Sequence, residues 1–192
     1  MKSYLALLRA VNVGGTGLLS MKELAALAAA AGFHNARTFI QSGNLLFESD
    51  LPKAQVRERL AEALRKKMGR DVGVMLREPP ELQAILKQNP FQNEPPAKVA
   101  VIFLPGPVDH AAFRNISGPA GEQVHARGSE VYVYYPDGMG RSKLKLPREA
   151  SEGTARNINT VTKLLALSAS PTPPAKKASK NRTNQVSTRS SS

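Results

Sequence analysis

The sequence predicts an α+β fold built from two ferredoxin-like halves, with antiparallel sheets and helices on one face. Three observations predict it. Short apolar runs of strand length alternate with amphipathic helical runs; the order β-α-β-β-α-β fits residues 1–77; and the order β-α-β-β-α recurs over residues 97–169. Residues 78–96 are predicted to form a connecting helix and linker, and residues 170–192 a disordered basic tail rich in Ser, Thr, Pro and Lys.

The elements of the first half follow from local patterns. Residues 3–9 form an apolar run typical of a buried strand. Ser20 and Glu23 have the spacing of a capping box, so a helix is predicted to begin there and to end at Gly32. The remaining predicted elements are strands at 37–41 and 45–49, a helix from Pro52 to Met68, and a strand at 72–77.

The second half is predicted in the same way. A short helix at 80–88 precedes it, and a hairpin turning at Gly128-Ser129 joins strands 123–127 and 130–135. The other predicted elements are a strand at 98–104, a helix at 108–116 and a final helix at 159–168. Residues 154–158 are interpreted as a loop that leads into the last helix, so this half lacks a fourth strand.

Composition restricts the class of protein. The chain has no cysteine, which excludes a disulfide framework and a thiolate metal site. Its three histidines do not cluster, so we expect neither a metal nor a cofactor. The apolar run at 4–8 is shorter than a signal peptide requires, and no run approaches the ~20 residues of a membrane span. A cytoplasmic location without a membrane partner is therefore predicted.

The net charge of +12 arises from 27 basic and 15 acidic residues. Both the folded region and the tail are basic, since residues 171–192 contain lysines and arginines but no acid. Such a charge favours anionic partners, which include phosphates, nucleotides and nucleic acid.

Four polar segments, three of which contain glycine, lie at the edges of apolar runs, at residues 9–15, 41–44, 135–143 and 154–160. Glycine permits close approach of a ligand to the backbone, and Asn, Ser and Arg supply directed hydrogen bonds. The candidate ligand-binding residues that these segments contribute are Arg9, Asn12, Gly14, Gly15, Ser42, Gly43, Asn44, Asp137, Gly138, Arg141, Ser142, Lys143, Arg156, Asn157 and Asn159.

Strand order predicts that two of these segments are neighbours. The chain runs along the first strand, returns through the helix and runs along the second strand, so the 12–17 loop and the 42–44 turn share one end of the sheet. The loop also precedes a helix N-terminus, which suits a phosphate or carboxylate. Arg141 and Lys143 concentrate charge at the third segment, but they reach the first two only if the halves pack head to tail.

At these segments the chain resembles a bacterial family catalogued as domain of unknown function 1697. The resemblance covers residues 1–168 and rests on Asn12-Val13-Gly14-Gly15, Gln41-Ser42-Gly43-Asn44, Gly140-Arg141-Ser142-Lys143 and Thr154-Ala155-Arg156-Asn157. Ala10 stands where family members usually have glycine, and Ile158 where many have tryptophan. The resemblance implies a duplicated ferredoxin-like fold. It implies no activity, cofactor or substrate.

Two functions follow from the sequence. The first is a site for an anionic small molecule or nucleotide, formed by the glycine-bearing loops. Whether it is catalytic stays open, because no general base stands out. The alternative is a nucleic-acid-binding module that uses the basic surface and tail, although aromatic residues for base stacking are few. The oligomeric state is not predicted.

Overall fold

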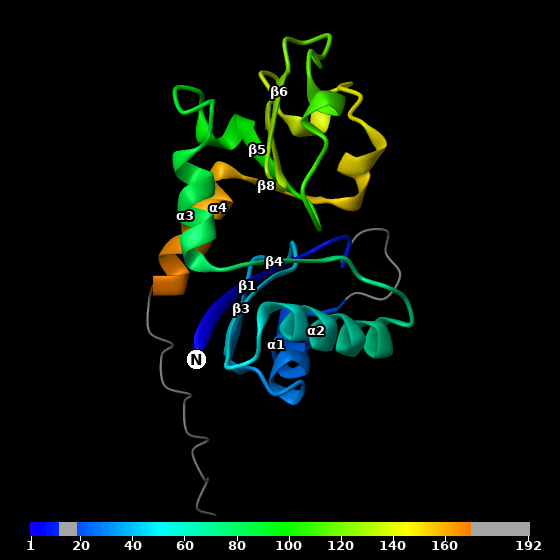
Figure 1. The fold of residues 1–192 in the computed structure, drawn as a ribbon, viewed down its shortest axis with the longest axis vertical. Coiled ribbons are helices and arrows are strands. Elements are labelled where there is room, and N and C mark those ends of the chain that lie inside the picture. The colour runs from blue at the N-terminus through cyan, green and yellow to red at the C-terminus, as the bar shows by residue number, and fades with distance from the viewer. Residues whose placement is uncertain (12–18, 170–192) are drawn as a thin grey trace, which may run out of the picture.

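The computed structural model describes residues 1–11 and 19–169. Within these residues it is a mixed α/β structure with two four-stranded antiparallel sheets and four α-helices (Figure 1). The predicted tail at 170–192 and the predicted loop at 12–17 lie outside the described residues. No helix of the described part is long and apolar enough to cross a membrane.

The first sheet has the strand order β2-β3-β1-β4, which places β4 at one edge. Its elements are β1 (Lys2–Leu8), α1 (Met21–Ala30), β2 (His34–Phe39), β3 (Asn44–Ser49), α2 (Lys53–Met68) and β4 (Val74–Arg77). The predicted capping box is confirmed, because Ser20 and Glu23 bond each other's backbone N–H groups at the start of α1.

The second sheet has the order β6-β7-β5-β8, so its strands are connected in the same order as those of the first. Its strands and the remaining helices are α3 (Pro79–Lys87), β5 (Val99–Phe103), β6 (Gln123–Arg127), β7 (Glu130–Tyr134), β8 (Thr154–Asn157) and α4 (Ile158–Ala169). The predicted hairpin at Gly128-Ser129 is confirmed as the β6–β7 connection.

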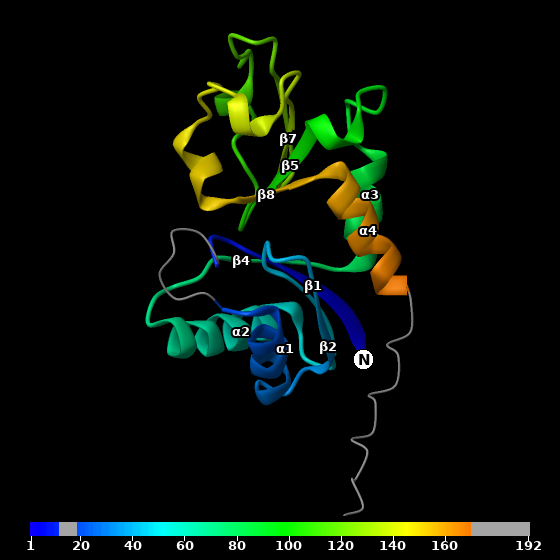
Figure 2. The ribbon, with the colours of Figure 1, turned by 180° about the vertical axis from the view of Figure 1, so that it is seen from behind.

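The two sheets share a core. Helices α1 and α2 cover one face of the first sheet, burying Tyr4, Ala6 and Leu8 of β1. The other face, with Leu5 and Leu7, packs against α3, α4 and the second sheet (Figures 1 and 2). The first sheet is therefore covered on both faces, which differs from the prediction of helices on one face. The far face of the second sheet packs against loops and short 3₁₀ turns.

Two predicted elements are wrong. The helix at 108–116 is only a 3₁₀ turn at His110–Phe113, because Asn115 adopts φ 57° and leaves too short a segment for a stable helix. The segment at 154–158 is not a loop, since residues 154–157 form β8, which pairs with β5. Its inward positions are Thr154 and Arg156, so the apolar alternation that signals a strand is missing.

The capping box makes a prediction about acid stability. Hydrogen bonds from Lys67 and Ser20 lower the pKa of Glu23 to about 2, below its ordinary value of 4.5. Because the folded-state pKa is the lower one, this stabilisation is complete above pH 4.5 and is lost as the pH falls towards 2. Glu23→Gln is expected to unfold at lower urea concentration than the wild type at pH 7. The difference in urea midpoint between Glu23→Gln and the wild type should narrow at pH 2. If it did not change with pH, the Glu23 carboxylate would not stabilise the start of α1 through its charge.

Candidate functional site

Arg156 of β8 connects the two halves of the protein. Its side chain is buried and reaches from the second sheet to the end of β1 and the turn before β3. Nε donates to Asn44 Oδ1 at 2.6 Å, and one terminal nitrogen, Nη2, donates to the carbonyl oxygens of Ser42 at 2.5 Å and Leu8 at 3.2 Å. Within its own strand, Arg156 also donates to Thr154 Oγ1 and to the Ala155 carbonyl, each at 2.7 Å.

The turn that accepts Arg156 is itself held by side-chain hydrogen bonds. Asn44 is fully buried, and its Nδ2 donates to the Phe39 carbonyl at 2.9 Å and to Ser42 Oγ at 2.8 Å. Gly43 adopts φ 75°, where a Cβ would lie 3.1 Å from that of Leu8. The Gly43 carbonyl accepts from the Leu8 N–H at 2.8 Å. This contact joins the end of β1 to the turn, as the strand order predicts.

A cavity of about 360 Å³ opens at this junction, and we call it the Arg156 cavity. Leu8 at the end of β1 lines it, and the other lining residues come from three of the four polar segments: Ala10, Val11, Gln41, Ser42, Thr154 and Arg156. Ser42 Oγ accepts from Asn44, which leaves the hydroxyl hydrogen as a donor. The structure therefore brings together parts of the first, second and fourth segments around one cavity.

The charge of Arg156 is unusual for a buried group. Burial lowers the pKa of its guanidinium to about 10, so it remains charged at neutral pH. Its contacts are with carbonyl, amide and hydroxyl oxygens, and no carboxylate of the described residues pairs with it. Arg70 adds a further cation, because its guanidinium donates to the Ala10 carbonyl at 2.7 Å. The cavity therefore lies in a positive field.

The third segment, residues 135–143, lies elsewhere. The Tyr135 N–H donates to the carbonyl of Lys98, just before β5, whereas Thr154 pairs with Phe103 at the other end of that strand. At ~3.4 Å per residue, Lys98 and Phe103 are about 17 Å apart. Asp137, Gly138, Arg141 and Lys143 are consequently not brought to the Arg156 cavity. Ser142 Oγ donates to Glu122 Oε1 at 2.5 Å within the second half.

The other candidate residues divide into three groups. Asn12, Gly14 and Gly15 lie outside the described residues. Arg9 is exposed, and its side chain passes over Gly73. Asn157 Oδ1 accepts from the Thr160 N–H at 2.9 Å, so Asn157, rather than Asn159 or Thr160, caps α4. Asn159 is an exposed residue of that helix.

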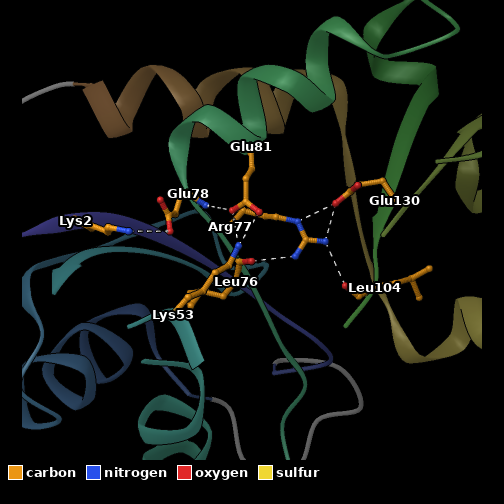
Figure 3. A network of polar contacts seen from close by, with 8 residues as sticks. All are labelled: Lys2, Lys53, Leu76, Arg77, Glu78, Glu81, Leu104 and Glu130. Atoms are coloured by element: carbon orange, nitrogen blue, oxygen red, sulfur yellow. Dashed lines mark hydrogen bonds and ion pairs between the residues drawn. The ribbon is translucent and has the colours of Figure 1, made fainter. Parts of the chain in front are cut away.

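A second buried arginine, which the sequence did not indicate, connects the halves in the opposite direction. Arg77 of β4 donates through Nε to Glu130 Oε1 at 2.8 Å and through a terminal nitrogen to the Leu104 carbonyl at 3.2 Å (Figure 3). It also donates to the Leu76 carbonyl at 3.0 Å. Arg77, Glu130 and Glu81 line a cavity of about 530 Å³, which we call the Arg77 cavity. The signal that could have identified Arg77 is a charged residue at the end of an apolar strand.

Three contacts of Arg77 have counterparts among the contacts of Arg156. Each lies in the last strand of its half and donates to the carbonyl just before its own position. Each also donates to the residue at or just beyond the end of the other half's first strand, Leu104 or Leu8, at 3.2 Å. The difference is in the third partner. Arg77 meets the carboxylate of Glu130, whereas Arg156 meets the neutral amide of Asn44.

Comparison with known proteins agrees with the resemblance read from the sequence. A family model described as a protein of unknown function, DUF1697, matches residues 1–132, more than half of the chain. The chain belongs to the DUF1697 family. The match is shorter than the range 1–168 over which the sequence resembles the family. Ala10, at the position where DUF1697 members usually have glycine, adopts φ 53°, a conformation that favours glycine.

A solved structure, described as that of a conserved bacterial protein from Streptococcus pneumoniae, is also similar to this DUF1697 chain. The TM-score is 0.72 at 21% sequence identity, and the alignment covers 87% of this chain and 98% of the other. This similarity shows the fold alone. No curated protein matches the chain.

Proposed function

We propose that this protein binds a small anionic ligand, a molecule bearing a phosphate or carboxylate group, in the Arg156 cavity. One observation carries the proposal: Arg156 is a buried cation that lines the cavity and pairs with no carboxylate of the described residues. A buried charge without a counter-ion is costly, and an anion in the cavity would offset that cost. At ~6 Å and an effective dielectric of about 20, the attraction is about 3 kcal/mol.

The chemistry of the lining supports binding rather than a defined reaction. Ser42 and Gln41 supply polar groups at the opening, and Leu8 and Val11 form an apolar wall. The described lining residues include no carboxylate and no imidazole that would act as a general base. The guanidinium of Arg156 acts through its charge, since its hydrogen bonds already go to the protein.

We further propose that the two halves descend from one ferredoxin-like unit. The matching strand orders and the three corresponding contacts of Arg77 and Arg156 support a duplication. Residues 1–77 and 97–169 would then be the two copies, joined by residues 78–96. On this view the Arg77 and Arg156 cavities are equivalent positions of the copies.

The test places a charge at the edge of the Arg156 cavity. Ala10 is exposed and adopts φ 53°, a conformation that both Asp and Asn tolerate. Thermal unfolding would be followed with inorganic phosphate, a mononucleotide and a sugar phosphate. A probe present at ~100 times its Kd stabilises the folded state by about 2.7 kcal/mol, which raises Tm by several degrees. Ala10→Asn is expected to keep this shift, and Ala10→Asp to lose it.

Equal shifts in the two Ala10 variants would contradict the proposal. An oligonucleotide in the same assay tests the alternative of nucleic-acid binding. Such binding would weaken steeply as the salt concentration rises, because many phosphate contacts release counter-ions. A mononucleotide at a single buried charge would show a much shallower dependence on salt.

A further inference from the structure

Residues 110–118 run beside the outer edge of β6 (Figure 1), and a cavity of about 520 Å³ opens between the two. At one end of β6, the Gly128 N–H donates to His110 Nε2 at 3.3 Å. At the other end, the Gly118 N–H donates to the Glu122 carbonyl at 3.2 Å. The neighbouring segment is therefore tied to both ends of β6 and separates from the strand in between. We call the cavity the β6 pocket.

The lining of the β6 pocket is rich in hydrogen-bond donors, and no described carboxylate lines it. Arg114 and Arg127 are exposed, and their guanidinium groups form no hydrogen bond or ion pair with other described residues. Asn115 adds an amide. The Ala126 N–H points to the same edge of β6 as the N–H of Gly128, two residues further on. Guanidinium, amide and backbone N–H groups are the donors with which proteins hold nucleic-acid phosphates.

The third polar segment extends this basic surface at the start of β6. Ser142 Oγ donates to Glu122 Oε1, which fixes the segment beside the strand, and accepts from the Leu144 N–H at 3.1 Å. Exposure then alternates along the segment, so Arg141 and Lys143 face solvent while Leu144 packs on the core of the second half. Neither cation forms an ion pair with a described carboxylate.

Four exposed cations thus follow the edge of β6, and we call them the β6 strip: Arg114, Arg127, Arg141 and Lys143. Glu130 stands opposite Arg127 in the β6–β7 ladder, but its carboxylate binds the Arg77 guanidinium at 2.7 Å. Two exposed carboxylates, Asp109 and Asp137, precede the two parts of the strip in sequence. The strip therefore keeps a positive charge when these neighbours are counted. Beyond it, two cations and two carboxylates balance: Lys145, Arg148, Glu149 and Glu152.

We propose that the β6 strip binds the sugar–phosphate backbone of a duplex nucleic acid, with one phosphate group in the β6 pocket. The strand β6 spans about 14 Å at ~3.4 Å per residue. Each strand of a duplex carries one phosphate per ~3.4 Å of its axis, so about four phosphates of one strand face the four cations. Base contacts are not needed, since most hydrogen bonds between proteins and a duplex go to phosphates and sugars.

Two features favour a duplex over other anions. None of the four strip residues is aromatic, so the strip offers no surface for the base stacking on which single-strand binding depends. Salt screens exposed arginines, so a small anion gains little there, whereas a polymer contacts several cations at once. The strands β6 and β8 lie at opposite edges of the second sheet. The proposal therefore concerns a different site from the Arg156 cavity and does not depend on anion binding there.

The probe is a short fluorescent DNA duplex, whose binding to the full chain is followed by anisotropy between ~50 and ~200 mM salt. The logarithm of the affinity should fall linearly with the logarithm of the salt concentration, because each bound phosphate releases counter-ions. Arg114→Gln and Arg141→Gln should each make this slope shallower by ~0.9, and the double variant by ~1.8. The basic residues at 171–192 are present in every variant, so the comparison between variants reports the strip alone.

The matched control is Arg65→Gln, which removes an exposed arginine from the last turn of α2 in the first half. The lysines beside it are already neutralised, since Lys66 pairs with Glu62 and Lys67 with Glu23. The control is expected to leave the salt slope unchanged. One strand of the same duplex serves as a second probe, and it should bind more weakly than the duplex at equal salt. Circular dichroism checks that each variant is folded.

Any of four results would overturn the proposal: no binding of the duplex at ~50 mM salt, equal slopes for the wild type and the double variant, an equal loss of slope in Arg65→Gln, or tighter binding of the single strand. Phosphate-induced stabilisation of the Arg114 and Arg141 variants should equal that of the wild type. A failure of the duplex tests is thus distinguishable from a failure of the anion site.

Discussion

Arg156→Met is expected to lower the free energy of unfolding by about 3–5 kcal/mol, because it leaves several buried acceptors without a donor. The acceptors are the Asn44 amide oxygen and the carbonyl oxygens of Leu8 and Ser42, which belong to the other half. Methionine fills much of the space that the arginine stem occupies, so the change tests the hydrogen bonds more than the packing. Urea denaturation followed by circular dichroism measures the difference.

The matched control for Arg156 is Arg127→Met. Arg127 is an exposed arginine of β6, and its replacement should change the free energy of unfolding by less than ~0.5 kcal/mol. Arg156→Lys keeps the charge but loses most of the directed bonds, so its stability should fall between those of the wild type and Arg156→Met. Equal stability of Arg156→Met and Arg127→Met would show that Arg156 does not hold the halves together.

Arg77→Met is expected to lower the free energy of unfolding by as much as Arg156→Met does, for a different reason. It leaves Glu130, whose side chain is 13% exposed, as a buried carboxylate without its partner, which typically costs about 3–5 kcal/mol. The double variant Arg77→Met/Glu130→Gln removes the charge as well and should regain part of that loss. A double-mutant cycle from urea denaturation measures the coupling between the two residues.

The matched control for Arg77 is Lys53→Met. Lys53 pairs with Glu81 in the same network, but these side chains are 38% and 43% exposed, so the loss should be at most ~1 kcal/mol (Figure 3). Equal stability of Arg77→Met and Arg77→Met/Glu130→Gln would show that the unpaired Glu130 carboxylate does not cause the loss of stability.

The strands and helices with a strong apolar period could be predicted from the sequence. The β6–β7 hairpin and α2 agree with their predicted bounds within one residue, because alternation or helical spacing marks the buried side chains. β8 could not be found in this way, since its inward residues are Thr154 and Arg156. Its inward polar groups are satisfied by the other half, and a local pattern contains no information about that contact.

Part of the candidate site followed from the sequence, because strand order brings the end of β1 beside the 42–44 turn. The position of residues 135–143 depended on how the halves pack, and it could not be derived from either half alone. The same packing buries Arg156 and makes it a link between sheets. That the Arg156 cavity receives an anion stays a prediction.

The difference between Glu130 and Asn44 has a consequence for stoichiometry. Both residues begin the third strand of their half and contact the arginine of the other half. The Glu130 carboxylate neutralises the charge of Arg77 from within the chain. The Asn44 amide is neutral and leaves the charge of Arg156 uncompensated. We therefore expect one bound small anion per chain, at Arg156, rather than two. A carboxylate at the start of one third strand and an amide at the start of the other are the basis of that expectation.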